Sequence, residues 1–416
     1  MIILEAFITN DAVVLGLLFT LLGVIFYTTT SSHPFWVKFY KVVPSLLLCY
    51  FIPSLLNTTG VIDGEKSGLY PVVSRYILPV SLVLLTISID YQSLKKLGGK
   101  AVLVFLAGSL GIVIGGPITV LLFSYISPET VGGEGPEAVW RGLSTIAGSW
   151  IGGSANQTAM KEVFGVGDKI FSAMITIDVI VANIWTGFLL YGAGIAPFLD
   201  KKLKADASAI TELQQKLETL QKENTTIPST ADIMKICAVG FGVMGLSHWL
   251  ADMIAPFIKN NYPYLEQFSL TSVFFWIVII ATTAGMLLAL TPVRKLEGRG
   301  ASKIGSILLY VLVATVGMKM DVMAIFENPG LFAVGIVWMM IHIITMLLVA
   351  KWLKAPFFFV AVGSQANVGG AASAPIVASA FSPALAPVGV LLAVLGYALG
   401  TYGAYICGLM MQAVAP

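Results

Sequence analysis

The sequence predicts an all-α polytopic membrane protein made of two inverted repeats, each with five transmembrane helices and one re-entrant, glycine-rich hairpin. Three observations predict this fold class. Hydrophobic residues make up 57% of the 416 residues and charged residues 11%, and the mean hydropathy of +0.88 excludes an ordinary soluble domain. The apolar runs are long enough to cross a bilayer, which takes roughly 20 helical residues. A Gly-Gly pair set among small polar residues occurs once in each half of the chain.

Twelve apolar elements are predicted along the chain. The first six lie near residues 11–29, 40–57, 69–90, 101–126, 138–164 and 169–197. The second six lie near residues 233–258, 270–293, 300–321, 331–354, 356–382 and 385–414. We interpret the elements near 138–164 and 356–382 as hairpins and the other ten as spans. The predicted organisation is a first repeat over 1–199, a cytoplasmic helical linker over 200–232 and a second repeat over 233–416.

The basic residues decide which elements cross the membrane. If the two glycine-rich elements are hairpins, the basic clusters all reach one face; they lie near residues 38–41, 95–100, 201–204, 294–299 and 351–354. The acidic loop with Glu129, Glu134 and Glu137 then reaches the opposite face. Because basic loops face the cytoplasm, the linker is expected there and both termini are expected outside. Crossing by both glycine-rich elements would instead separate the basic clusters between the two faces.

The two glycine-rich segments predict a binding site. Gly148–Met160 reads GSWIGGSANQTAM, and Gly363–Val377 reads GSQANVGGAASAPIV. Glycine lets a helix break, and broken backbone at membrane depth persists only where protein or a water-filled cavity covers it. A matched pair of such breaks, one in each half, indicates the substrate site of a transporter.

Aligned residues predict that the second half repeats the first. The pair Gly152-Gly153 matches the pair Gly369-Gly370, and at the same offset Asn183 falls opposite Gly400. Upstream, ISIDYQSL matches MKMDVMAI, so that Asp90 pairs with Asp321. Five spans in each half are an odd number of crossings, and the second repeat is therefore inverted relative to the first.

The paired segments, together with the closing helix at 396–405 that reads GYALGTYGAY, resemble the YjcL-like membrane proteins, a family of undefined function. More distantly, the paired GG hairpins resemble the sodium-coupled citrate (2-hydroxycarboxylate) and glutamate carriers. That resemblance implies a GG motif at each hairpin tip, a homodimer and an elevator movement. Those carriers hold substrate carboxylates with basic side chains, and neither hairpin core here contains Arg or Lys. The sequence therefore gives no support for a dicarboxylate or tricarboxylate.

The candidate binding residues are small or polar residues of the hairpins and of the helices that follow them. They are Ser149, Gly152, Gly153, Ser154, Asn156 and Gln157 in hairpin one, Ser364, Gln365, Asn367, Gly369, Gly370 and Ser373 in hairpin two, and Thr176, Asp178, Asn183 and Thr401 in the spans. Carbonyls freed by the breaks can coordinate a cation, and N–H groups at helix starts can hold an anion. The alternative is that small residues allow close helix packing and that the amides join helices.

Asp178 and the oxygen-bearing residues leave two coupling ions open. Ser154, Asn156, Asn367 and Thr401 form a neutral oxygen set suited to Na+, which we favour. Asp178 is an intramembrane carboxylate, either a proton or ion site or a buried hydrogen-bond acceptor. On a regular helix Asp178 points away from the face shared by Thr176 and Asn183.

The sequence thus predicts an ion-coupled secondary active transporter, not an enzyme, of a small organic solute such as an amino acid, short peptide or monocarboxylate. A passive channel or facilitator is the alternative, and an intramembrane enzyme is less favoured. Besides Na+ or H+ no cofactor is expected, and a net charge of +2 gives no case for a nucleic-acid partner. A homodimer in the bacterial inner (plasma) membrane is expected. The segment 205–223 is expected to be either a dimer contact or a solvated tether between the halves.

Overall fold

The computed structural model describes residues 7–40, 43, 45–64, 66–205, 228–319, 328–382 and 385–416. In these ranges the chain is helical apart from turns, loops and one isolated bridge between Ile8 and Ile62. The segment expected as a helix near 205–223 lies, apart from Ala205, outside the described residues, and so does Asp321, the expected counterpart of Asp90.

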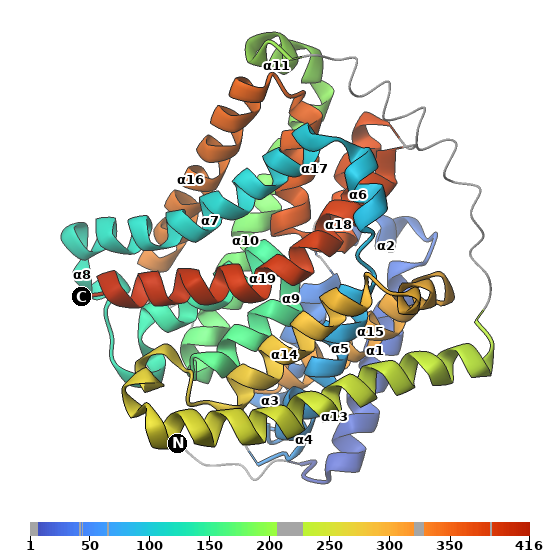
Figure 1. The fold of residues 1–416 in the computed structure, drawn as a ribbon, viewed down its shortest axis with the longest axis vertical. Helices are drawn as coiled ribbons and strands as arrows, with labels where there is room; N and C mark the ends of the chain where they lie inside the picture. Colours follow the sequence, from blue (N-terminus) through green and yellow to red (C-terminus); the bar gives the residue numbers. More distant parts are fainter. Residues whose placement is uncertain are drawn as a thin grey trace.

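Every expected apolar element contains at least one helix (Figure 1). The helices of the first half are α1 (Asp11–Thr29), α2 (Pro34–Phe39), α3 (Ser45–Thr58), α4 (Leu69–Val72), η1 (Val73–Ile77), α5 (Leu78–Ile87), α6 (Tyr91–Leu97), α7 (Gly99–Ile126), α8 (Pro128–Val131), η2 (Gly135–Glu137), α9 (Val139–Val163), α10 (Asp168–Gly194) and α11 (Ala196–Leu203). Those of the second half are α13 (Thr230–Asn261), η3 (Pro263–Phe268), α14 (Val273–Leu288), η4 (Pro292–Arg299), α15 (Ala301–Gly317), α16 (Gly330–Leu353), α17 (Phe357–Val368), α18 (Gly370–Phe381) and α19 (Ala386–Val414).

Local capping residues fix several helix starts. Asn10 accepts hydrogen bonds from the first backbone N–H groups of α1, and Asp90 does the same for α6. Ser229 and Asp232 form a reciprocal capping box at the start of α13. These polar caps lie directly before or within the first turn of the helix that they start.

Seven described helices are long and apolar enough to cross a membrane, or eight if the bent pair α14–η4 is one span. The expected spans at α3, α14 and α15 are shorter, with 14, 16 and 17 residues. At about 1.5 Å per residue each reaches only roughly 21–26 Å, less than the ~30 Å hydrocarbon core. The chain turns by 94° between α14 and η4, which ends the expected 270–293 span at Leu288.

The helices form two bundles (Figure 1). The bundles meet where α5 and α14 of the first contact α9 and α19 of the second. The first bundle contains α1, α3, α4, α5, α13, α14 and α15. The second bundle contains α7, α9, α10, α16, α17, α18 and α19. Each bundle therefore takes elements from both halves of the chain.

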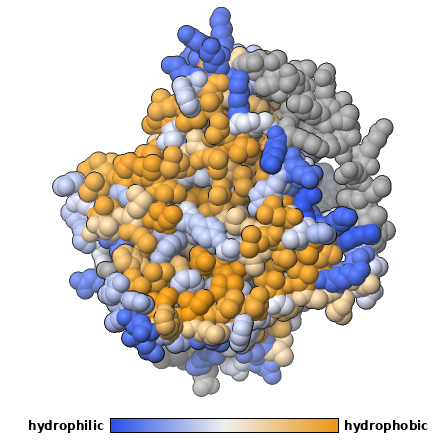
Figure 2. Space-filling view, in the orientation of Figure 1, coloured by the Kyte–Doolittle hydropathy of each residue, from blue (hydrophilic) through white to orange (hydrophobic). Residues whose placement is uncertain are grey.

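Apolar residues cover much of the outer surface. In Figure 2 hydrophobic residues occupy most of the visible face, and hydrophilic residues gather at its top, right and lower-left margins. On α13, Trp249, Met253 and Phe257 are each more than half exposed. Such large apolar side chains are stable outside only where lipid or protein replaces water. The chain is an integral membrane protein.

Candidate functional site

Both glycine-rich elements fold back on themselves. α9, which we call hairpin one, breaks at Gly153, where φ is 75° and ψ is −175°. At its two ends the rings of Trp140 and Phe164 lie 5.6 Å apart, centroid to centroid, and Arg141 donates to the Phe164 carbonyl. The start of the first arm and the end of the second arm thus lie side by side, and the element returns to the face of the bundle from which it began.

Hairpin two consists of α17 and α18. It breaks at Gly369 and Gly370, and Gly370 has a φ of +63°. The rings of Phe358 and Phe381, near its two ends, lie 5.2 Å apart. Both elements interpreted as hairpins from the sequence therefore bring their ends together.

Asn156 ties hairpin one to the middle of α19. Its Nδ2 donates to the Gly152 carbonyl and to the Tyr397 carbonyl, both at 2.9 Å. Its Oδ1 accepts from the hydroxyl of Thr401. The helices approach so closely here that a Cβ on Gly400 would lie 2.6 Å from the Asn156 Nδ2.

Asn367 makes the same set of contacts between hairpin two and α7. Its Nδ2 donates to the Gly363 carbonyl at 3.2 Å and to the Phe105 carbonyl at 3.1 Å, and its Oδ1 accepts from Ser109 Oγ at 2.8 Å. In each hairpin the amide reaches back four residues on its own helix. On the neighbouring helix it binds a carbonyl and a hydroxyl that are also four residues apart.

Both asparagines are therefore occupied within the protein. Each side chain is fully buried, and both Nδ2 protons have acceptors. Of the four predicted Na+ ligands, the structure brings Asn156 and Thr401 together and places Asn367 against α7. Ser154 is half-buried after the break in hairpin one. These contacts favour a role for the two amides in holding the hairpins in place.

Asp178 lies between α10 and hairpin one. Its Oδ1 accepts from Trp150 Nε1 at 2.7 Å and its Oδ2 from Gln157 Nε2 at 3.0 Å. The two donors belong to opposite arms of the hairpin. Asn183, by contrast, is exposed, and its amide bonds the carbonyl of Val179 on its own helix. Of the alternatives left open by the sequence, this geometry favours a buried acceptor.

Asp178→Leu should lower the free energy of unfolding by about 2–4 kcal/mol, because it leaves two buried N–H donors without an acceptor. Asp178→Asn should cost less, since its amide oxygen still accepts one of them. Thermal unfolding of the purified protein measures both. Asn183→Leu, on the exposed face of the same helix, is the control and should change stability by less than about 0.5 kcal/mol. Equal unfolding temperatures for Asp178→Leu and the control would contradict the acceptor role.

The remaining polar residues of hairpin two face α10 and α16. Ser364 bonds Trp185 Nε1 at 2.7 Å and His342 Nε2 at 2.8 Å. Gln365 accepts from Thr186 at 3.0 Å and donates to Ser373 at 2.7 Å, on the far side of the break. The remaining predicted residues, Ser149 and Thr176, lie buried in hairpin one and half-buried on α10. No group of three or more His, Cys, Asp or Glu residues that could hold a metal occurs among the described residues.

A cavity of about 270 Å³ lies at the seam between the bundles, next to hairpin two. Its polar lining includes Asp90, Arg294 and Glu297 from the first bundle. Ala371 of hairpin two and Tyr397 of α19 line the other side. The sequence did not single out Arg294 or Glu297 as site residues. The basic cluster at 294–299 was a signal, but it fitted a cytoplasmic loop equally well.

The acidic groups of the cavity differ in their proton affinity. Burial raises the pKa of Asp90, but hydrogen bonds from Ser93 and the charge of Arg294 outweigh it and hold the pKa below its usual value. Burial raises the pKa of Glu297, against the lowering effects of Ser302 and Arg294. Asp90 is therefore a fixed negative charge, and Glu297 takes up a proton more readily.

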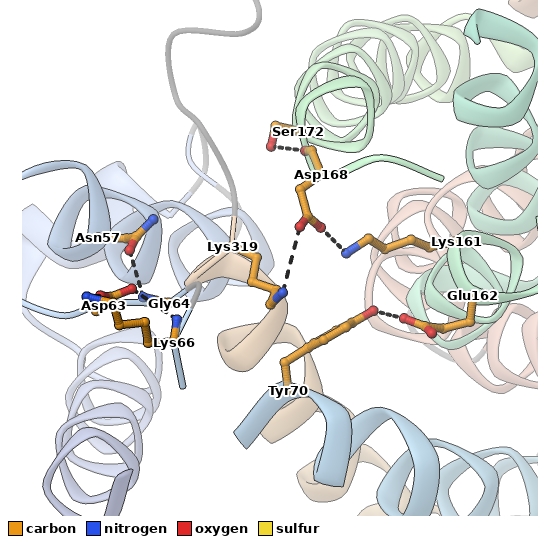
Figure 3. Close-up of polar contacts among 10 residues, drawn as sticks. All are labelled: Asn57, Asp63, Gly64, Lys66, Tyr70, Lys161, Glu162, Asp168, Ser172 and Lys319. Carbon is orange, nitrogen blue, oxygen red and sulfur yellow. Dashed lines mark hydrogen bonds and ion pairs between the residues drawn. The ribbon is translucent and has the colours of Figure 1, made fainter. Parts of the chain in front are cut away.

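A polar cluster bridges the bundles at the other end of the seam. Figure 3 shows Tyr70 and Lys319 of the first bundle directed toward Lys161, Glu162 and Asp168 of the second. Tyr70 donates to Glu162, Lys161 pairs with Asp168, and Lys319 Nζ lies 3.8 Å from Asp168 Oδ2. Tyr70 lies in the first turn of the helical segment Leu69–Ile87, and Asp90 follows the end of that segment. Lys319 follows the end of α15, and Arg294 lies before its start. The seam is thus bridged at one end and hollow at the other.

One buried tyrosine of the first bundle faces hairpin one. Tyr50 of α3 is 1% exposed, and its Oη lies near the hydroxyls of Ser154 and Thr158.

Comparison with known proteins identifies the family. The profile of the family described as "Protein of unknown function (DUF819)" matches residues 16–414. The chain belongs to the DUF819 family. The uncharacterized membrane protein YjcL of Bacillus subtilis (strain 168) is 22% identical over 367 residues, which cover 84% of this chain and 85% of YjcL. The resemblance to YjcL-like membrane proteins predicted from the sequence is confirmed for this DUF819 protein.

Proposed function

We propose that this DUF819 protein is an ion-coupled secondary active transporter of a small organic solute, with Na+ favoured as the coupling ion. One observation carries the proposal: two fold-back hairpins lie within one bundle, and a cavity separates the tip of one from the other bundle. Broken helices beside a cavity are the usual place for solute and ion in such carriers. The hydroxyls of Ser154 and Tyr50, which lie near each other, add polar groups near this seam.

The distribution of elements supports an inverted repeat and an elevator movement. The first bundle takes α1, α3 and α4–α5 from the first half and α13, α14 and α15 from the second. The second bundle takes a long helix, a hairpin and a further long helix from each half. In our proposal the second bundle moves against the first, as in the citrate and glutamate carriers that the hairpins resemble.

The polar bridges at one end of the seam and the cavity at the other support an arrangement closed on one side. Arg294 belongs to a basic cluster expected in the cytoplasm, so the cavity would open inward. In our proposal the protein is a homodimer in the bacterial inner membrane, with both termini outside. Breaking and remaking the bridges around Tyr70 and Lys319 would accompany the movement.

Na+ should raise the unfolding temperature of the purified protein where equal concentrations of K+ do not. The reason is that a ligand that binds only the folded state stabilises it, by about 2.7 kcal/mol at a hundred times its dissociation constant. In proteoliposomes, an inward Na+ gradient should drive accumulation of solutes from an amino-acid and monocarboxylate mixture, and Asp178→Asn should retain it.

The same proteoliposomes separate the alternatives. One positive charge moving down ~100 mV supplies about 2.3 kcal/mol. That is roughly a fiftyfold solute gradient, because each 1.4 kcal/mol is tenfold. Flux that only equilibrates the solute would identify a passive facilitator instead. Uptake that needs only a pH gradient and is lost in Asp178→Asn would assign the coupling to H+.

A further inference from the structure

The charged wall of the seam cavity carries two carboxylates and one guanidinium. Asp90, Arg294 and Glu297 are its charged lining residues in the part of the chain that the structure describes. Ser88, Ser302 and Ser306 complete the polar wall. The wall can therefore meet a ligand with both a negative and a positive group, and the excess of carboxylates favours a positive one.

Arg294 has donor capacity left for a carboxylate. Its Nη2 pairs with Asp90 Oδ2, and its side chain is 38% exposed, so that part of the guanidinium remains accessible from the cavity. A guanidinium offers five N–H donors in a fixed fork that matches a carboxylate. The Asp90 carboxylate is held in place, because it accepts from the backbone N–H of Gln92 at 3.1 Å and of Ser93 at 2.9 Å. If Arg294 turns toward a ligand, Asp90 therefore stays where it is.

Glu297 has acceptor capacity left for an ammonium. Its two oxygens accept from the backbone N–H of Ser302 at 2.9 Å and from the Ser302 hydroxyl at 2.6 Å. A carboxylate offers about four lone-pair positions, so further donors can be accepted. An ammonium placed between Glu297 and Asp90 would also offset the excess negative charge of the wall.

The rest of the cavity is apolar and small. Its apolar lining includes Leu85 of α5 and Val390, Leu391 and Val394 of α19. A volume of about 270 Å³ falls just below the range of roughly 300–1,000 Å³ that holds drug-sized ligands. The space suits a small solute with a short aliphatic group.

We propose that this cavity binds a zwitterionic amino acid with an aliphatic side chain. Its carboxylate lies on Arg294, its ammonium lies toward Glu297 and Asp90, and its side chain lies against Val390 and Val394. A role of this site in transport rests on the proposed function. The binding of the amino acid can be tested without it.

Thermal unfolding of the full-length purified protein with three probes tests the site. L-leucine carries both charged groups, 4-methylpentanoate lacks the amino group, and 3-methylbutylamine lacks the carboxylate. At millimolar concentrations leucine should raise the unfolding temperature by about 2–5 °C, and each single-charge probe by less than about 1 °C. No response to leucine, or an equal response to either single-charge probe, would overturn the proposal.

Matched variants assign the response to the cavity. Arg294→Gln should abolish the leucine shift, whereas Arg299→Gln should keep it. Arg299 lies on the same η4 segment, outside the cavity, and pairs with Asp232 at 3.7 Å. If Arg294→Gln does not fold, Val390→Trp serves instead, because Val390 lines the cavity and a larger side chain there would occupy part of its volume. A leucine shift that survives in Val390→Trp would place the binding elsewhere.

Failure of this inference and failure of the proposed function have different signatures. Leucine binding without ion-driven uptake would contradict transport and leave the zwitterion site intact. Ion-driven uptake of another solute, with no leucine shift, would contradict only the site.

Discussion

Joining Thr282 to Thr401 through a disulfide should stop transport. Thr282 lies on α14 of the first bundle and Thr401 on α19 of the second, and their hydroxyl oxygens are 3.2 Å apart. If the bundles must move against each other, a covalent link between them blocks the cycle while leaving each bundle folded. We expect uptake by the oxidised Thr282→Cys/Thr401→Cys protein to fall at least about tenfold, because a cycle limited by a movement cannot be completed when the movement is blocked.

The measurement uses proteoliposomes before and after dithiothreitol, in a background without the native Cys49, Cys237 and Cys407. Reduction should restore uptake, which separates the link from the substitutions.

A pair within one bundle provides the control for the crosslink. Ser67 Oγ donates to Asp11 Oδ1 at 2.7 Å, and both residues belong to the first bundle. Oxidation of Asp11→Cys/Ser67→Cys should leave uptake unchanged. Full uptake by the oxidised pair between the bundles would contradict an elevator movement and favour a fixed pathway.

Gly153→Ala should disrupt hairpin one. The backbone at Gly153, with φ of 75° and ψ of −175°, lies in a region that is essentially restricted to glycine. An added Cβ would lie 3.5 Å from the Tyr397 ring, which is ordinary contact, so the expected cost comes from the backbone. We expect a loss of about 1–3 kcal/mol in the free energy of unfolding, together with loss of uptake.

Gly187→Ala is the matched control for this substitution. Gly187 lies inside α10, and an added Cβ there would have no other atom within 4 Å. Alanine in a helix interior is favoured over glycine by roughly 0.5–1 kcal/mol, so the unfolding temperature should be unchanged or higher. If both variants unfold alike, the break in hairpin one does not have the described conformation.

For Asn156 and Asn367 the sequence motif predicted the position of the helix breaks correctly. It did not show what the two side-chain amides would bind. Small polar residues around a Gly-Gly pair mark a helix break, because glycine and local hydrogen bonding act within a few residues. Whether an amide then faces a solute or a neighbouring helix depends on segments far along the chain. Asn156 meets Tyr397 and Thr401, more than 240 residues later.

The sequence by itself determined the membrane class, the positions of the twelve elements and the two breaks. Hydropathy and glycine content act locally, and lipid requires every backbone group to be paired within its helix. The helix α14 ends at Leu288, before the expected end near residue 293, because apolar composition does not reveal the bend of the chain between α14 and η4.

Only the tertiary structure decided the site. Arg294 and Glu297 lie on the short segment η4, and packing brings them to a cavity beside hairpin two, more than 70 residues further along the chain. Asp178 likewise became an acceptor for Trp150 and Gln157 because hairpin one folds against α10. Such long-range contacts depend on how whole helices pack, which the period and composition of single segments do not encode.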